Sequence, residues 1–291
     1  MRRFLLVAAV FGLASGAQAA DMPDFLRGSL PGVSSFRNWD GWYAGGQVDY
    51  SSANIDLSHA PASLTGYMLR NTVIQQPVAG LGLFGAQHAQ ATGFGAFVGR
   101  NYQSDDLVYG FEANYVYINS LATSATAGMA RRIDNPGGQI LPAGHTDRWD
   151  INLSGNAALQ VKDVTTFRGR VGWAAGDFLP YAFGGLAVGR IAVSRSVTVN
   201  ATETDVSYPP NLLGVPTELD KVLCSTQCAF GTMSESRGNS FVAGYTAGLG
   251  TEVMLFGNVF GRVEWEYVKF LSVKDMTTSM NSVRVGAGYK F

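Results

Sequence analysis

Side chains that bind metals or carry redox chemistry are scarce in this sequence. Its 291 residues include only 2 Cys and 3 His, which removes the usual ligands of zinc sites and most His-based catalytic groups. Charged residues make up 15% of the chain and the formal net charge is -1, so no excess of Lys and Arg is available to neutralise phosphates. We therefore expect neither a bound cofactor nor a general nucleic-acid binder.

Long hydrophobic runs are also missing, apart from a short one at the start. Arg2 and Arg3 precede the apolar segment 4–16, which is followed by the small-x-small pattern of residues 17–19. This arrangement predicts a signal peptide over 1–19, cleaved between Ala19 and Ala20. The alternative, a membrane anchor, is disfavoured because the run is shorter than the ~20 residues that span a bilayer. No later run reaches that length, so an exported chain is either soluble or a β-barrel.

What the sequence does have is glycine (36 residues), aromatic residues (12%) and a strict alternation of side-chain character. At the end of the chain, Val283, Val285, Tyr289 and Phe291 alternate with polar or small residues such as Arg284. Alternation with a period of two places the two sets on opposite faces of one strand. Similar blocks lie near 42–50, 110–117, 167–173, 241–253 and 259–267. The segments 93–102 and 181–199 are also strand-like, but their alternation does not assign their faces.

These blocks predict about eight strands, an even number, each near the ~10 residues of a tilted membrane strand. The connections alternate in length. Short turns are expected near 103–106, 176–180 and 256–258. Long loops are expected near 52–91, 119–160 and 200–239, with a shorter one near 271–278. We expect an irregular periplasmic lead over 20–40, then an eight-stranded antiparallel transmembrane β-barrel over 41–291, with short periplasmic turns and long external loops.

The polar faces of these strands carry charges of both signs. They are Asp49, Glu112, Arg168, Arg170, Glu252, Arg262, Glu264, Glu266 and Arg284. In a membrane barrel this face points inward, where opposite charges can pair and limit the cost of burial. In a soluble barrel the faces are reversed. The signal peptide and the loop asymmetry favour the membrane barrel, with its apolar and aromatic face toward lipid.

Four segments together resemble one known family. They are Gly-Trp-Tyr-Ala-Gly-Gly-Gln-Val at 41–48, Phe-Arg-Gly-Arg-Val-Gly-Trp at 167–173, the segment 178–187, and Val-Arg-Val-Gly-Ala-Gly-Tyr-Lys-Phe at 283–291. With the Ala-Asp-Met-Pro at 20–23, they resemble the small outer-membrane surface-antigen barrels of alphaproteobacteria, the porin-family or outer-membrane immunogenic proteins. The resemblance implies an eight-stranded outer-membrane barrel that contributes to envelope integrity and surface exposure. Some relatives are linked to solute passage or to binding of haem compounds. The loops here are longer than the family pattern.

The last strand also resembles the signal that barrel-assembly machinery reads, a terminal aromatic preceded by apolar residues at alternate positions. Val283, Val285, Tyr289 and Phe291 fit that pattern. The alternative is an ordinary edge strand.

Other chemistry is less well supported by the residues. Cys224 and Cys228 can form a loop disulfide in an oxidising compartment, with free thiols as the alternative. Glu264 and Glu266 could form a glycosidase pair, but pairing with arginines inside the barrel is favoured. The three His residues fall in predicted loops, where they are solvated or contact haem or a metal.

The barrel size constrains function, because eight strands enclose a space that side chains just fill. We therefore expect a structural, surface-exposed protein with a filled lumen, and no enzyme. The alternatives are a narrow porin for small solutes, or loops that bind a ligand such as a haem compound or a host surface component. The expected partners are outer-membrane lipid, lipopolysaccharide and the assembly machinery, with no nucleic acid.

Overall fold

The computed structural model describes residues 37–138, 140–207, 218–224 and 229–291. Residues 37–291 belong to one compact unit. The predicted signal peptide with its cleavage site at Ala19 and Ala20, and most of the lead 20–40, lie outside the described residues. The proposed Cys224–Cys228 disulfide lies outside them as well, because it needs the Cys228 side chain.

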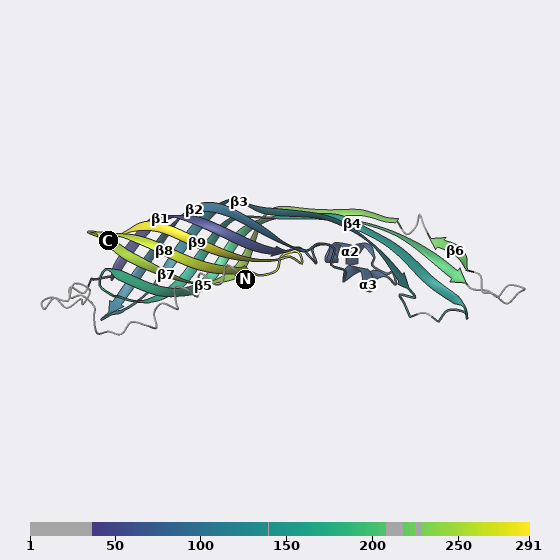
Figure 1. Cartoon of the computed structure of the whole chain (residues 1–291), viewed down its shortest axis with the longest axis horizontal. Coiled ribbons are helices and arrows are strands. Elements are labelled where there is room, and N and C mark those ends of the chain that lie inside the picture. Colours follow the sequence, from purple (N-terminus) through teal and green to yellow (C-terminus); the bar gives the residue numbers. More distant parts are fainter. Residues whose placement is uncertain (1–36, 139, 208–217, 225–228) are drawn as a thin grey trace, which may run out of the picture. The chain divides into compact units, whose positions relative to one another are not determined.

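Eight antiparallel strands close into a ring (Figure 1). In ring order they are β1 (Gly41–Asp56), β2 (Ala86–Ser104), β3 (Leu107–Asp134), β4 (His145–Trp173), β5 (Phe178–Ser207), β7 (Ala229–Phe256), β8 (Val259–Phe270) and β9 (Thr277–Lys290). The first and last strands meet, with Tyr43 opposite Lys290 and Asp56 opposite Thr277. The short β6 (Leu219–Cys224) pairs only with the far end of β5. The predicted all-β barrel is confirmed.

One end of the barrel, here called the turn end, carries three tight connections between β2 and β3, β4 and β5, and β7 and β8. Each contains a residue with positive φ, namely Asp105 (53°), Gly176 (63°) and Gly257 (55°). Glycine adopts this left-handed conformation without steric cost, and Asp tolerates it better than most residues. These turns fall where the alternating pattern predicted them. The opposite end is called the loop end.

The expected strand lengths were wrong for half of the ring. Two segments assigned to loops, 119–160 and 200–239, are largely strand, and β3, β4, β5 and β7 are each 28 to 30 residues long. Beyond the barrel they form a sheet extension, made of residues 121–134, 145–161, 191–207 and 229–240. In 121–130, Ala, Ser and Thr alternate, so the contrast between the two faces is too weak to identify a strand from sequence. In 148–154, by contrast, buried Trp149, Ile151 and Leu153 alternate with polar residues, and this strand signal was overlooked.

A row of register shifts marks the boundary between barrel and extension. The pairing shifts between Tyr117 and Leu121 in β3, between Val161 and Asp163 in β4, and between Ile191 and Val193 in β5. An extra residue in one strand bends it and increases its twist. Three such shifts across neighbouring strands explain why the sheet leaves the ring along one line.

The predicted loop 52–91 contains two short helices, α2 (Ala62–Met68) and α3 (Gln75–Ala79). Their buried residues Leu64 and Val78 join an apolar core with Trp149, Leu153 and Val197 of the extension. The helices therefore cover one face of the extension beside the loop end of the barrel (Figure 1). None of the helices within the described residues is both long enough and apolar enough to cross a membrane.

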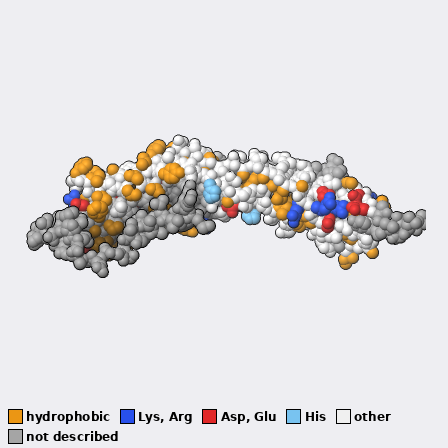
Figure 2. Space-filling model, viewed as in Figure 1, with side chains coloured by type: hydrophobic (Ala, Val, Ile, Leu, Met, Phe, Trp, Pro, Cys, Tyr) orange, Lys and Arg blue, Asp and Glu red, His pale blue; other side chains and the backbone are white. Residues whose placement is uncertain are grey.

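The outer wall of the barrel is apolar and aromatic. Trp42, Phe94, Phe167, Trp173 and Tyr245 are each at least 49% exposed. On the side seen in Figure 2, hydrophobic side chains are scattered over the barrel, whereas charged ones gather toward the far end of the extension. A wall with this many exposed aromatic side chains is unusual for a protein surrounded by water and typical of a strand face in lipid.

Candidate functional site: the filling of the barrel

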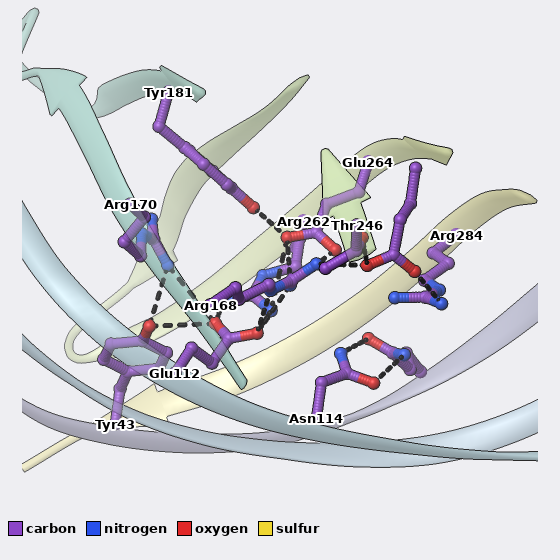
Figure 3. A network of polar contacts seen from close by, with 12 residues as sticks. Tyr43, Glu112, Asn114, Arg168, Arg170, Tyr181, Thr246, Arg262, Glu264 and Arg284 are labelled. Atoms are coloured by element: carbon purple, nitrogen blue, oxygen red, sulfur yellow. Dashed lines mark hydrogen bonds and ion pairs between the residues drawn. The ribbon is translucent and has the colours of Figure 1, made fainter. Parts of the chain in front are cut away.

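The interior of the barrel is filled by a charged layer at mid-height. All nine charged residues singled out in the sequence are buried, none more than 4% exposed. Four arginines meet five carboxylates there. Figure 3 shows the four arginines with Glu112 and Glu264 between them. Period-two alternation delivers each of them to the inner face of its strand, since their neighbours in sequence lie on the outer wall.

Glu112 on β3 is the centre of this layer. Its carboxylate accepts hydrogen bonds from Arg168 on β4, at 2.5 and 3.0 Å, and from Arg262 on β8, at 2.6 and 3.1 Å. Tyr43 donates to the same carboxylate at 2.8 Å. Bonds between charged partners are the strong ones, and several of them on one carboxylate offset the cost of removing it from water.

Two further carboxylates surround the same arginines. Glu264 accepts from Arg168 at 2.6 and 2.7 Å and from the Tyr181 hydroxyl at 2.5 Å. Glu252 accepts from Arg170 at 2.8 Å and from Arg262 at 2.7 and 3.0 Å. Each arginine is thus shared between carboxylates of different strands, which ties the ring together across its interior.

A second branch of the network lies toward the loop end. Arg284 on β9 donates to Asp49 on β1 at 3.0 Å and makes a short ion pair with Glu266 on β8. Glu266 also accepts from Thr246 at 2.7 Å and contacts Arg168 at 3.4 Å. Glu264 and Glu266 are therefore both held by arginines inside the barrel, as expected for a filling rather than for a glycosidase pair.

Aromatic rings fill the space between the charges, a feature that the sequence did not indicate. The guanidinium of Arg262 lies 3.7 Å from the ring centre of Phe97, that of Arg170 lies 3.9 Å from Tyr181, and that of Arg168 lies 4.0 Å from Phe183. Such cation–π contacts stabilise a desolvated arginine by about 2 kcal/mol or more. They also require room: a Cβ at Gly99 would collide with the Tyr43 ring.

The turn end is closed by the chain just before β1. Trp39 is 1% exposed, its backbone N–H donates to the Gln103 side chain at 2.6 Å, and its indole N–H donates to the Gly176 carbonyl at 3.3 Å. Lys290 holds the same segment through the carbonyls of Asn38 and Asp40. The last residues of the predicted irregular lead therefore form a plug at this end of the barrel.

The loop end is closed by an apolar layer and by one buried arginine. Arg195 on β5 is 3% exposed and donates to the Ala60 carbonyl at 2.7 Å and to the Ser63 hydroxyl at 2.9 Å, both near the start of α2. It also donates to the Lys274 carbonyl at 2.9 Å, in the connection between β8 and β9, and to Glu235 on β7 at 2.8 Å. We call Arg195 and these four partners the Arg195 latch.

The Glu235 carboxylate forms two ion pairs, one with the Lys274 ammonium at 2.6 Å and one with the Arg195 guanidinium at 2.8 Å. Hydrogen bonds from Lys274 and then Arg195 lower the pKa of its carboxyl to about 2. Sequence analysis missed this latch because Arg195 lies in the block 181–199, whose faces the weak alternation left unassigned.

The remaining candidates lie elsewhere. His145 contacts Asp205 at 2.9 Å on neighbouring strands of the extension, while His59 follows β1 and His88 lies on β2. Among the described residues, no three His, Cys, Asp or Glu are grouped so that they could hold a metal ion. Val283, Val285, Tyr289 and Phe291 are all exposed, and Phe291 donates its backbone N–H to Trp42 at the turn end.

Curated relatives are similar over part of their length. The 25 kDa outer-membrane immunogenic protein of Brucella ovis is 26% identical over 68% of this chain, and the match spans 62% of that protein. The 22 kDa outer membrane protein of Rhizobium leguminosarum is 25% identical over 72% of this chain and 72% of its own. This chain thus matches less than two thirds of the Brucella protein.

Solved structures were compared as well. The match with Ail, the attachment invasion locus protein of Yersinia pestis, spans 87% of this chain and 99% of the Ail chain, with 11% sequence identity and a TM-score of 0.33. Neisserial surface protein A covers 86% and 97% at 13% identity, with a TM-score of 0.27.

The sequence model described as outer membrane protein beta-barrel domain matches residues 5–291, which include every strand of the ring. With its closed antiparallel ring, its apolar wall and its charged interior, the chain belongs to this family of outer-membrane β-barrel proteins.

Proposed function

We propose that this protein is a closed, non-conducting barrel of the outer membrane, which anchors a folded sheet at the cell surface. The observation that carries the proposal is the burial of side chains at three levels of the barrel interior. Trp39 covers the turn end, nine buried charges occupy the middle, and an apolar layer held by Arg195 covers the loop end. Eight strands leave room for side chains rather than for a wide aqueous channel.

The orientation and assembly of the barrel complete the proposal. A cleaved signal peptide over 1–19 delivers the chain to the periplasm, and assembly machinery reads the terminal strand with Phe291 as its last residue. The turn end then faces the periplasm and the sheet extension faces outward, the usual asymmetry of outer-membrane barrels. Outer-membrane lipid and lipopolysaccharide contact the aromatic wall.

Surface display fits the arrangement and the names of the relatives. The Brucella relative is named an immunogenic outer-membrane protein, and an exposed sheet is a surface that antibodies or host components can reach. In this proposal the barrel supplies the anchor and the extension supplies the contact surface. No step of catalysis is required of either part.

Reconstitution in planar bilayers tests the closed barrel. The refolded protein should give no stable unitary currents. A double variant, Trp39→Ala with Arg195→Ala, should remain non-conducting, because the nine buried charges still occupy the middle of the barrel. Stable currents from this variant would show that the two ends, and not the charged layer, close the barrel. Stable currents from the unaltered protein that disappear when Glu112 or Arg262 is substituted would establish a narrow porin instead.

A further inference from the structure

The sheet extension has two open edges within the part of the chain that the structure describes. The pairing of β3 with β2 stops at Ile118, so residues 121–134 pair with β4 alone. The pairing of β7 with β8 starts at Gly244, and the Ala243 carbonyl still accepts the backbone N–H of Leu271, so residues 229–242 pair with β5 alone. An open edge presents unpaired backbone N–H and C=O groups, which can bind another strand.

The two edges lie at matching positions of the same sheet. Thr126 on β3 is opposite Asn156 on β4, which is opposite Ser196 on β5, which is opposite Ser234 on β7. The next row toward the barrel on the same face joins Ser124, Ala158, Ser194 and Ser236 in the same way. The extension is thus four strands wide, from β3 through β4 and β5 to β7. Residues of its two open edges lie on the same hydrogen-bonded rows.

The composition of the β3 edge favours pairing rather than solvation. Residues 121–130 contain no charged residue and no proline, the two features by which natural proteins usually protect an edge strand. The β7 edge carries only Glu235 and Arg237 between residues 229 and 240, and Glu235 is turned inward to Arg195. The stretch 121–130 lacks this protection, whereas the charges of the β3 edge are confined to its far end at 131–134 and the exposed charge of the β7 edge is Arg237.

The two edges also run in opposite directions, because β3 leaves the barrel and β7 returns to it. Copies inserted in one membrane share one orientation. The β3 edge of one copy and the β7 edge of its neighbour are therefore antiparallel, the more stable arrangement of paired strands. Contact between two β3 edges, related by a two-fold axis along the membrane normal, would be parallel.

We infer that the occupant of these edges is a second copy of this chain. The β3 edge pairs with the β7 edge of a neighbouring copy, and the extensions join into a continuous sheet above the membrane. Because each copy uses a different edge on each side, the contact is head-to-tail and forms rows or rings rather than closed two-fold dimers.

Cysteine cross-linking in intact outer membranes tests the inference. Two differently tagged chains are expressed together, one with Thr126→Cys and the other with Ser234→Cys, both in a Cys224→Ser, Cys228→Ser background. A short bis-maleimide should link the two tags several-fold more than it links either chain to its own kind. Ser196→Cys, on the central β5 of the same row and face, is the matched control and should remain monomeric.

A chain that carries both Thr126→Cys and Ser234→Cys should give a ladder of trimers and larger species. Ser124→Cys with Ser236→Cys repeats the test one row away, with Ser194→Cys as its control, if the first pair disturbs folding. Heat-modified gel mobility identifies folded variants. Cross-linking no greater than that of the Ser196→Cys control, or linkage mainly between two β3 edges, would overturn the inference.

Discussion

At the scale of single residues, Glu112 does the most to hold the barrel interior together. Its carboxylate accepts hydrogen bonds from Arg168, Arg262 and Tyr43, and the residue is 2% exposed. A buried ion pair contributes little net stability by itself, but loss of one partner leaves a charge without compensation in a dry interior. Substitution of Glu112 would therefore leave Arg168 and Arg262 buried with less negative charge to compensate them.

We predict that Glu112→Gln lowers the free energy of unfolding by about 3–5 kcal/mol. Urea titration in detergent micelles, followed by tryptophan fluorescence, measures the change. Asp150→Asn is the matched control, because it removes a carboxylate from an exposed arginine pair and should cost at most about 1 kcal/mol. Equal losses in the two variants would contradict the central position of Glu112.

Arg195→Ala should release the segment between β1 and β2. The side chain holds Ala60 and Ser63 near the start of α2, and Arg70 is the only Lys or Arg between residues 57 and 85. Trypsin should therefore cut after Arg70 much faster in Arg195→Ala than in the unaltered protein, as read by mass spectrometry. Arg132→Ala should leave that rate unchanged; similar rates in all three proteins would show that Arg195 does not hold the segment.

The latch should weaken only in strong acid. The pKa of Glu235 is about 2 in the folded protein, below the value of about 4.3 for an unpaired Glu. Its contribution to stability is therefore fully present above about pH 4.3 and is lost as the pH falls toward 2. The difference in unfolding free energy between the unaltered protein and Glu235→Gln should be constant from pH 7 to 5 and should vanish near pH 2. A difference that changes between pH 7 and 5 would contradict this assignment.

At the scale of elements, two apolar clusters follow one another along the barrel axis. Tyr43, Phe97, Tyr181 and Phe260 belong to the first, near the turn end. The second begins inside the loop end of the barrel, with residues such as Ile118 and Val268, and continues past the row of register shifts to Trp149 and Val197 of the extension. The barrel and the extension therefore share the second cluster, and only the first belongs to the barrel alone.

Removal of both hairpins of the extension should leave the ring intact. Replacing 122–160 and 193–237 with short Gly–Ser turns retains the charged layer and its eight strands. The shortened protein should still migrate as a folded species on gels before boiling, although it loses the Arg195 latch and the part of the second cluster that the extension supplies. Replacement of the barrel segment 164–170, which includes Arg168 and Arg170, should abolish that species. If the hairpin deletion also abolished it, the ring would depend on the extension.

At the scale of the whole molecule, every ring strand is paired on both sides within the barrel. Closed barrels of this kind resist detergent because no backbone group is left unpaired in the membrane. The purified protein should migrate as a compact form before boiling and more slowly after it. A single mobility in both conditions would contradict a closed barrel in detergent.

The sequence predicted the ring well because its strands alternate strongly contrasting residues. Arg168 and Arg170 next to Phe167 and Val171 identify two faces without ambiguity. The β3 part of the extension was missed because Ala125, Thr126 and Ala127 differ too little for their faces to be told apart.

The residues that close the two ends of the barrel were missed for another reason. Trp39 and Arg195 act through contacts with residues more than 60 positions away, which no local pattern encodes.

The pairing of β1 with β9 has a consequence for the kinetics of folding. Gly45 and Gly288 are neighbours in the ring, so the step that closes it joins segments separated by nearly the whole barrel sequence. Such distant contacts are slow to form, because the chain entropy of a long loop is lost before any contact rewards it. The ring cannot close before residues 277–290 pair with β1. Closure should therefore be the slow step of folding, and its rate should depend on the topology of the chain more than on any single contact.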